Sequence, residues 1–204
     1  VKYDICGKVI VAINDAELPR LESIYWRGIA NGLEKIRYIG KDELKEIEPH
    51  AYGIKAIHVP YTGIIDYKEV SKKYAELILN AGGELRFSEK VVNVKDSGGR
   101  IEIATRNSSF NTKVFINCCG LQSDEVAGLS EKRIDTRIIP FRGEYYKIKP
   151  ERRFLVKNLI YPVPNPAFPF LGVHFTRMTN GEVEAGPNAV LSFKKEGYKK
   201  TSFS

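Results

Sequence analysis

A histidine interrupts an otherwise apolar strand pattern near the C-terminal end of the sequence, in FPFLGVHFTRMTNGEVEAGPN at residues 168–188. Two-residue alternation predicts that Gly172, His174 and Thr176 share one face of this strand. Histidine is the natural proton acceptor or hydrogen-bond donor at neutral pH, so His174 is a candidate for chemistry. A structural histidine would fit the same pattern. Arg177 falls on the opposite face and could reach the same ligand only through a bulge or a strong twist.

A second polar group lies in IIPFRGEYYKI at residues 138–148. Alternation places Arg142, Glu144 and Tyr146 on one face of a strand. Gly143, inside the same strand, is typical of a place where a ligand or another backbone comes close. A surface ion pair between Arg142 and Glu144 explains the charges equally well.

The third candidate is a strand–turn–helix pattern in VFINCCGLQSDEVAGL at residues 114–129. The apolar strand runs into small residues, and a helix is predicted to begin near Ser123. Backbone N–H groups at such a helix start favour an anion or a polar ring edge. An ordinary strand-to-helix connection has the same pattern.

The helices and strands that must position these residues are predicted from the periodicity of apolar residues and from the residues that begin and end each element. Helices are predicted over 15–32, 40–49 and 66–83, the last capped by Asp66 and ended by Gly82 and Gly83. Strands are predicted over 5–13, 53–60, 84–95, 100–106, 112–120, 133–148 and 168–188, with 112–120 apolar on both faces like a buried strand. This order predicts an α+β protein, an α/β layer plus an antiparallel sheet, with one part inserted into the other.

Composition limits the class of partner. The net charge is +7, from 32 Lys and Arg against 25 Asp and Glu, and the charges are intermixed. No basic arm or nucleic-acid motif is present, which argues against a nucleic-acid partner, whereas an excess of positive charge suits a dianionic substrate or a peripheral contact with anionic lipid. No apolar run is long enough to span a membrane. The three cysteines form neither a disulfide framework nor a metal-ligand spacing, which favours the cytoplasm and no metal.

Several longer stretches resemble one known family. They are CGKVIVAINDAELPRL, EIEPHAYGIKAI, PYTGIIDY, NCCGLQSDEVA, PFRGEYYKIKPE, LIYPVPNPAFPFLGVHFTRM and EAGPNAVLSFKKEGY. From Cys6 to Tyr198 the chain resembles the L-2-hydroxyglutarate oxidase/dehydrogenase family, which belongs to the FAD-dependent oxidoreductases of the D-amino-acid oxidase and glycine oxidase type.

The resemblance implies a reaction and an organisation. The implied reaction oxidises L-2-hydroxyglutarate to 2-oxoglutarate with hydride transfer to the flavin of FAD, and oxygen or a quinone then accepts the electrons. The implied parts are a substrate part at 1–62 and 131–182, an FAD-binding part at 63–130, and a return towards it at 183–204. A cytoplasmic location follows, with a possible peripheral contact at the inner membrane.

The resemblance also implies roles for particular residues. His174 would be catalytic, and Arg142, Tyr146 and Arg177 would bind the two carboxylates of the substrate. The residues implied to line the cofactor are Val91 and Val92 at its adenine end, the turn of Asn117, Cys118, Cys119, Gly120 and Leu121, and Asn188 near the flavin ring.

Two family features are missing from the sequence. Members begin with a GxGxxG turn that holds the ADP part of FAD and carry a late glycine-rich segment beside the flavin. The sequence therefore predicts an internal fragment that needs the missing N- and C-terminal segments of its own chain, and that by itself holds FAD weakly or not at all. Two alternatives remain, namely a related FAD-dependent 2-hydroxy acid, 2-amino acid or glycerol-3-phosphate oxidase, and an inactive stand-alone binding module.

Overall fold

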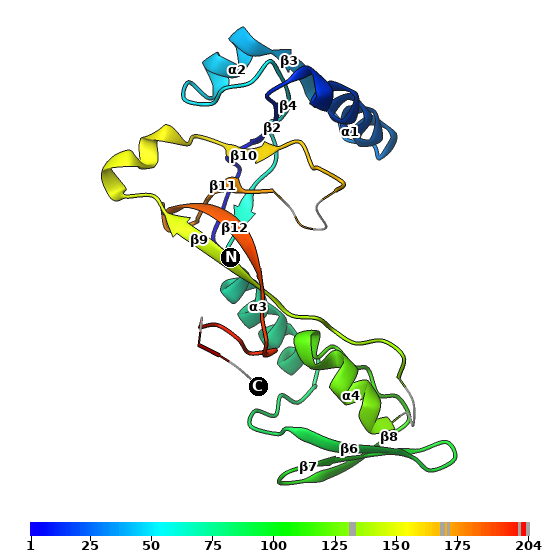
Figure 1. The fold of residues 1–204 in the computed structure, drawn as a ribbon. Helices are drawn as coiled ribbons and strands as arrows, with labels where there is room; N and C mark the ends of the chain where they lie inside the picture. Colours follow the sequence, from blue (N-terminus) through cyan, green and yellow to red (C-terminus); the bar gives the residue numbers. More distant parts are fainter. Residues whose placement is uncertain (131–133, 168–169, 171, 200, 203–204) are drawn as a thin grey trace. The chain divides into compact units, whose positions relative to one another are not determined.

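The computed structural model describes residues 1–130, 134–167, 170, 172–199 and 201–202 (Figure 1). The contacts within the chain divide it into two compact units. The first unit comprises Val1–Glu76 and Gly143–Ala189, and the second comprises Leu77–Arg142 and Val190–Ser204. The assignment of segments to a substrate part and an FAD-binding part stays a prediction.

A seven-stranded mixed sheet is the framework of the first unit, and its last two strands continue past the division between the units. Its order is β3-β4-β2-β10-β11-β12-β9. The strands are β2 (Lys8–Ala12), β3 (Arg37–Gly40), β4 (Lys55–Val59), β9 (Phe141–Lys147), β10 (Leu159–Pro162), β11 (His174–Arg177) and β12 (Val183–Leu191). β2 and β10 run parallel, whereas β10–β11, β11–β12, β2–β4 and β3–β4 are antiparallel. Helices combined with mainly antiparallel pairing confirm the predicted α+β class.

Two helices bury the faces of this sheet. The helix α1 (Leu18–Ala30) follows the short turn η1 (Asp15–Glu17) and places Leu21 against Ala12, Ile57 and Val163. The helix α2 (Lys41–Ile47) packs Leu44 onto the other face, in a buried cluster of Val9, Val11, Ile39, Leu44 and Ala56. Apolar residues three and four apart on each helix produce these contacts, which confirms both helices.

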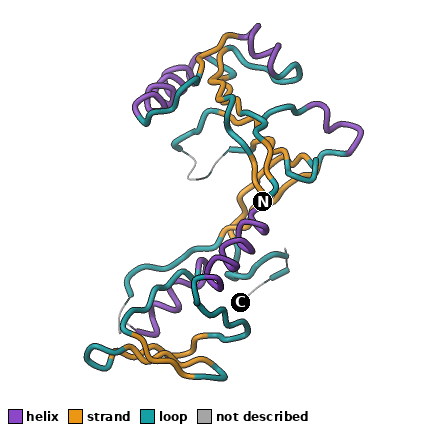
Figure 2. Tube along the Cα trace, turned by 180° about the vertical axis from the view of Figure 1, so that it is seen from behind, coloured by secondary structure: helices purple, strands orange, loops and turns teal. Residues whose placement is uncertain are grey.

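A small antiparallel sheet and two helices organise the rest of the chain. In the second unit, β6 (Val91–Asp96), β7 (Ile101–Thr105) and β8 (Ser109–Thr112) form a three-stranded meander, seen as orange strands in Figure 2. The turn η2 (Gly120–Gln122) leads into α4 (Ser123–Ser130). In the first unit, β1 (Tyr3–Asp4) pairs with β5 (Ile64–Ile65), and η3 (Pro150–Leu155) precedes β10.

The helix α3 (Tyr67–Asn80) has the predicted caps. Oδ1 of Asp66 accepts hydrogen bonds from the backbone N–H groups of Lys68 and Glu69 at 2.9 and 3.3 Å. At the other end, the N–H groups of Gly82 and Gly83 donate hydrogen bonds to carbonyl oxygens of the last turn. Gly82 has φ +82°, a left-handed conformation that glycine adopts without strain.

The predicted buried strand over 112–120 is wrong, because only Thr112 lies in a strand there. Val114 and Ile116 are 68% and 76% exposed. A strand that is apolar on both faces forms only when it is hydrogen-bonded on its edges and covered on its faces. Within the described residues, no strand pairs with 113–119, so the apolar pattern lacks the neighbours it needs.

Two other strand predictions are too long. The strand predicted over 84–95 begins at Val91, and the one predicted over 133–148 is formed only over Phe141–Lys147. Within 168–188 the described strands are β11 and part of β12, and Leu171 lies outside the described residues. Gly186 and Pro187 lie inside β12.

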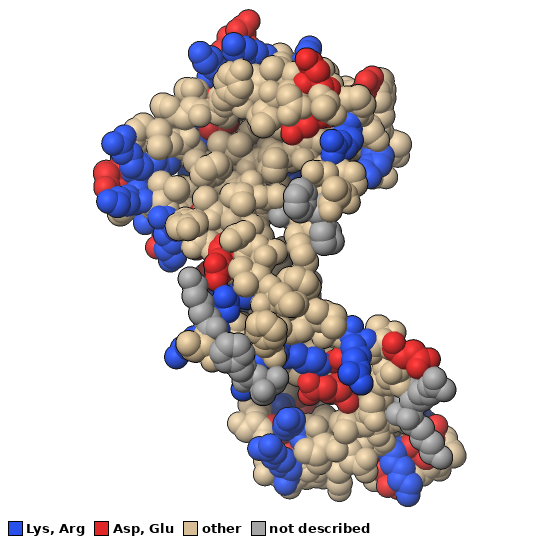
Figure 3. Space-filling view, in the orientation of Figure 1, with Lys and Arg blue, Asp and Glu red and all other residues tan. Residues whose placement is uncertain are grey.

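The charged residues do not gather into one basic surface on the face shown in Figure 3, where basic and acidic side chains are intermixed in both units. This distribution agrees with the intermixed charges of the sequence. None of the helices in the described part of the chain has the length and apolar character that crossing a membrane requires.

Candidate functional site

His174 is held in a row of side chains across three neighbouring strands of the first unit. The strand β10 lies between β2 and β11, so Tyr161 stands between Lys8 and His174. The rings of Tyr161 and His174 stack with centroids 4.1 Å apart and an angle of 20°. Nζ of Lys8 lies 3.8 Å from the Tyr161 centroid. We call Lys8, Tyr161 and His174 the sheet row.

The backbone fixes the tautomer of His174. Nδ1 lies 3.0 Å from the carbonyl oxygen of Gly172. A carbonyl oxygen only accepts hydrogen bonds, so Nδ1 carries a proton, and the tautomer with this arrangement has a lone pair on Nε2. The side chain is 7% exposed, and its orientation is fixed by the stack and by this hydrogen bond. The orientation of the His174 ring is therefore fixed, and its catalytic role stays a prediction.

A pocket of about 590 Å³ adjoins this row in the first unit. Its wall includes Leu159 and Tyr161 from β10 and Thr176 and Arg177 from β11. Burial raises the pKa of Tyr161, so its hydroxyl stays protonated and can donate a hydrogen bond at neutral pH. The pocket thus joins Thr176, from the His174 face, with Arg177, which was expected on the opposite face.

Arg177 is engaged within the protein. Its Nη1 donates to the carbonyl oxygen of Lys157 at 3.0 Å, and its Nη2 lies 3.7 Å from Oδ2 of Asp4. These contacts fix the guanidinium at the pocket wall. A carboxylate entering the pocket would compete with Asp4 for the same donors.

The other residues predicted to bind substrate or flavin lie elsewhere in the fold. Tyr146 is 78% exposed on β9, and Asn188 is exposed on β12, both in the first unit. Arg142 belongs to the second unit, where its Nη1 donates to the carbonyl oxygen of Gly197 at 3.4 Å. Their roles stay predictions.

Three of the residues predicted to line the cofactor share one pocket in the second unit, whereas Asn188 belongs to the first unit. A pocket of about 1240 Å³ is lined by Val91 and Val92 from β6 and by Cys119 from the following turn. Its wall also contains Val126 and Leu129 of α4. A strand and a turn that are separated by more than twenty residues in sequence thus share one largely apolar pocket.

The turn that carries Cys118 and Cys119 is fixed by Asn117. The amide Nδ2 of Asn117 donates to the carbonyl oxygen of Ser123 at 2.7 Å, and its Oδ1 accepts from the N–H of Cys119 at 3.2 Å. Gly120 follows with φ +55° and Leu121 lies in η2. Both cysteines are free and exposed. The asparagine holds the turn against the start of α4.

Lys195, at the wall of the second-unit pocket, forms ion pairs with the first turn of α4. Lys195 donates to Oδ1 of Asp124, and its Nζ lies 3.1 Å from Oε1 of Glu125. The N–H of Ile138 also donates to Oδ2 of Asp124, at 3.1 Å. The hydrogen bond from Lys195, followed by the one from Ile138, lowers the pKa of Asp124 to about 2.

This lowered pKa predicts a loss of stability in acid. Because the carboxyl of Asp124 has its ordinary pKa near 3.8 in the unfolded chain, the ion pair stabilises the fold fully above that pH, and this stabilisation is lost as the pH falls towards about 2. The variant Asp124→Asn should flatten this dependence of the urea midpoint on pH. Glu125→Gln is the matched control, since Glu125 is 59% exposed, and an equal flattening in that variant would contradict the assignment.

The sequence reasoning missed Lys8 and Tyr161. A signal was present for Lys8, because a lysine opens the otherwise apolar strand KVIVA, as the histidine interrupts its own strand. No signal marked Tyr161 beforehand, since only the pairing of β10 with β11 brings it to His174. Among the described residues, no group of His, Cys, Asp and Glu could hold a metal ion.

Comparison with known proteins identifies the family of the chain. The model of the family described as FAD dependent oxidoreductase matches residues 1–202. The chain is 55% identical to L-2-hydroxyglutarate dehydrogenase of Indibacter alkaliphilus over 98% of the chain and 51% of that protein. It is 41% identical to the Escherichia coli K12 protein of the same name, over 100% of the chain and 48% of that protein. The chain thus spans about half the length of the curated relatives it matches.

Solved structures show the same fold. L-alpha-glycerophosphate oxidase from Mycoplasma pneumoniae, solved with FAD bound, has a TM-score of 0.84 and 26% identity over 96% of the chain and 52% of that structure. Glycine oxidase from Geobacillus kaustophilus, at 16% identity, has a TM-score of 0.75 over 94% of the chain and 49% of that structure, and shows the fold alone. Because the family model matches nearly every residue of the chain, the chain belongs to the family of FAD-dependent oxidoreductases.

Proposed function

We propose that the whole protein is an FAD-dependent dehydrogenase that oxidises L-2-hydroxyglutarate to 2-oxoglutarate. The observation that carries this proposal is the 55% identity to an L-2-hydroxyglutarate dehydrogenase over 98% of the chain. The fixed tautomer of His174 supports it independently, since oxidation of an alcohol requires a group that takes the hydroxyl proton.

The second-unit pocket suits part of the cofactor. Val91 and Val92 provide apolar contacts for a flat ring such as adenine, and Asn117 fixes the neighbouring turn against the start of α4. A Cβ added at Gly120 would meet nothing within 4 Å, so the turn is open on that side. We assign this pocket to the adenosine end of FAD, and Asn188 to the flavin end. When bound, FAD supplies the acceptor for the hydride that leaves the hydroxyl-bearing carbon.

The residues of the chain have separate tasks in this reaction. Nε2 of His174 accepts the proton of the substrate hydroxyl as the C–H hydride departs and the C=O bond forms. Arg177 lines the first-unit pocket, where its charge-assisted donors can bind a substrate carboxylate. Arg142 and Tyr146 stay separate candidates for binding a carboxylate. Bidentate arginine contacts fix the orientation of a carboxylate, so the reacting carbon is positioned with its hydroxyl towards His174.

In this proposal, oxygen or a quinone accepts the electrons of the reduced flavin. The relatives are bacterial or mitochondrial proteins, which suits a protein in the cytoplasm or at the inner membrane. The net charge of +7 is consistent with a peripheral contact with anionic lipid.

A flavin spectrum tests the function directly. Anaerobic addition of L-2-hydroxyglutarate to the whole protein should bleach the visible absorbance of the bound flavin, whereas the D enantiomer should not. Oxidation of glycerol 3-phosphate is the second candidate, favoured by the TM-score of 0.84 to a glycerophosphate oxidase. Bleaching by glycerol 3-phosphate without bleaching by L-2-hydroxyglutarate would reverse our choice.

A further inference from the structure

Lys8 occupies an unusual place for a lysine. It is the first residue of β2, which lies between β4 and β10 in the interior of the seven-stranded sheet. Lysines in sheets are typical of edge strands, where they oppose pairing with other chains. Gly7 fixes the point of entry into β2 with φ +75°, and a side chain there would come within 2.9 Å of Oδ1 of Asn158. The backbone therefore fixes Lys8 at this interior position.

Among the residues that the structure describes, the ammonium group of Lys8 has no anionic partner. In the described part of the chain, no salt bridge and no side-chain hydrogen bond involves Lys8. Its one defined contact is with the ring of Tyr161, 3.8 Å from the centroid. Burial lowers the pKa of Lys8, which means that the surroundings compensate its charge incompletely. An anion bound here would supply that compensation.

The ammonium group also has access to a ligand. Of the described residues, only Arg153 has a fully buried side-chain nitrogen or oxygen without a partner, so Nζ of Lys8 keeps contact with solvent. Lys8 contacts the Tyr161 ring from β2, on one side of β10. His174 stacks on the same ring from β11, on the other side of β10. A cation and a proton acceptor thus flank one tyrosine ring.

We propose that Lys8 binds the carboxylate at the far end of the substrate, while the hydroxyl-bearing carbon lies towards His174. This inference rests on the proposed function, and it makes Lys8 a specificity-determining residue for five-carbon dicarboxylates. The two carboxylates of such an acid stand at opposite ends of a short chain, which suits a cation and a base separated by one aromatic ring. A compact ammonium binds a carboxylate oxygen as a point charge, and the tyrosine ring orients it.

A simpler explanation is that Lys8 only covers apolar surface with its stem while its charge stays in water. That explanation predicts no preference between diacids and monoacids. Arg177, which lines the first-unit pocket, already contacts Lys157 and Asp4. Lys8 is therefore the basic residue of the first unit that combines a place beside the His174 stack with a charge for which no carboxylate partner is defined.

The test compares two substrates in the whole protein with FAD bound. In Lys8→Met, kcat/KM for L-2-hydroxyglutarate should fall about ten- to a hundredfold, as expected for the loss of a hydrogen bond to a charged group. For L-2-hydroxypentanoate, in which a methyl group replaces the far carboxylate, kcat/KM should change less than about threefold. Equal losses for both acids, or no loss for either, would overturn the proposal. Lys8→Arg should retain most of the preference for the diacid.

A binding measurement separates this proposal from the proposed function. By titration calorimetry, the dissociation constant of glutarate, which has no hydroxyl to oxidise, should rise about tenfold or more in Lys8→Met. The matched control is Lys55→Met. Lys55 is an exposed lysine on β4, and its Nζ lies 5.6 Å from the ring centroid of Tyr38. If the wild-type protein oxidises no L-2-hydroxyglutarate, the proposed function fails, yet loss of glutarate binding in Lys8→Met still supports the anion site. The anion site at Lys8 would be overturned if the wild-type protein bound no glutarate, or if Lys8→Met bound glutarate as tightly as the wild type.

Discussion

Replacement of His174 by glutamine is expected to lower kcat of the whole protein about a hundred- to ten-thousandfold, the range that general-base catalysis contributes. Glutamine keeps a polar side chain of similar size next to Tyr161, but its amide cannot accept a proton at neutral pH. Because Nδ1 is held by Gly172, the loss falls on Nε2, the atom assigned to the substrate hydroxyl.

The measurement is the anaerobic rate of flavin reduction at saturating L-2-hydroxyglutarate. His58→Gln is the matched control, since His58 is another partly buried strand histidine, on β4, whose Nδ1 contacts Arg37 at 3.2 Å. That variant should react within about threefold of the wild-type rate. A His174→Gln protein with a similarly small loss would show that His174 is only a structural member of the sheet row.

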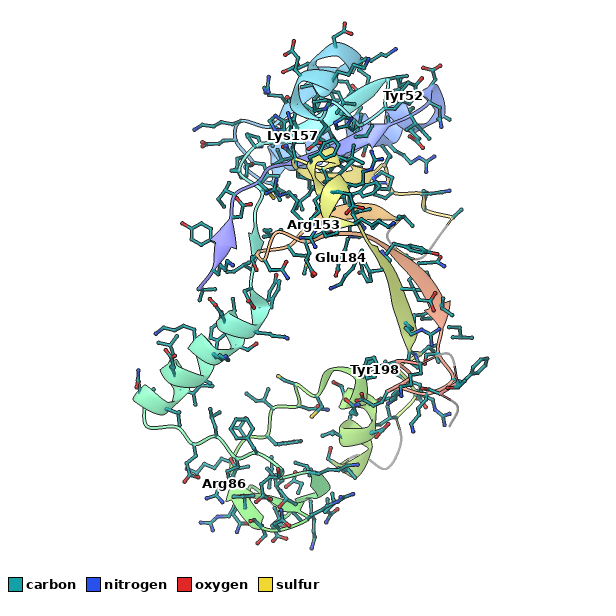
Figure 4. The ribbon with its side chains drawn as sticks, turned by 90° about the vertical axis from the view of Figure 1, so that its left-hand side faces the viewer. Tyr52, Arg86, Arg153, Lys157, Glu184 and Tyr198 are labelled. Atoms are coloured by element: carbon teal, nitrogen blue, oxygen red, sulfur yellow. The ribbon has the colours of Figure 1, made fainter. Side chains whose placement is uncertain are left out.

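Replacement of Glu48 by alanine is expected to lower the free energy of unfolding by about 3–5 kcal/mol, because two buried backbone donors lose their acceptor. Glu48 has no exposed surface. Its carboxylate accepts hydrogen bonds from the N–H of Lys157, at 3.1 and 3.2 Å, and from the N–H of Asn158. Lys157, labelled in Figure 4, leads into β10, so Glu48 holds the strand that carries Tyr161.

Urea unfolding of the whole protein measures this effect. Glu46→Ala, on the exposed side of α2, should change stability by less than about 0.5 kcal/mol. Glu48→Gln keeps an acceptor and should cost less than Glu48→Ala. Equal stability of Glu48→Ala and Glu46→Ala would remove Glu48 from the support of β10.

The buried carboxyl of Glu48 adds a dependence on pH. Burial raises the pKa of Glu48 above its ordinary value of 4.5, so the folded protein holds this proton more tightly than the unfolded chain. The resulting stabilisation is complete below the ordinary pKa and is lost as the pH rises through the raised value. Glu48→Gln should remove this part of the pH dependence.

Much of the local structure follows from short-range pattern. The helices α1 and α3 appear where apolar spacing, Asp66 and the glycine pair predict them, because caps and helical periodicity are properties of neighbouring residues. The segment 113–119 differs, since a strand apolar on both faces depends on partners from elsewhere. In the described residues, those partners are absent and Ile116 is exposed.

For the candidate site, the sequence by itself determined His174 as the residue to examine and the family to which the chain belongs, because both rest on residue types in a fixed local order. The tertiary structure decided what stands beside it. The order β2-β10-β11 brings Lys8 and Tyr161 to His174. In the sequence, Lys8 is more than a hundred positions from His174, and Tyr161 is fewer than twenty positions from it. Strand order is set by long-range hydrogen bonding and by burial of both sheet faces. The residue spacing within a single segment predicts neither of them.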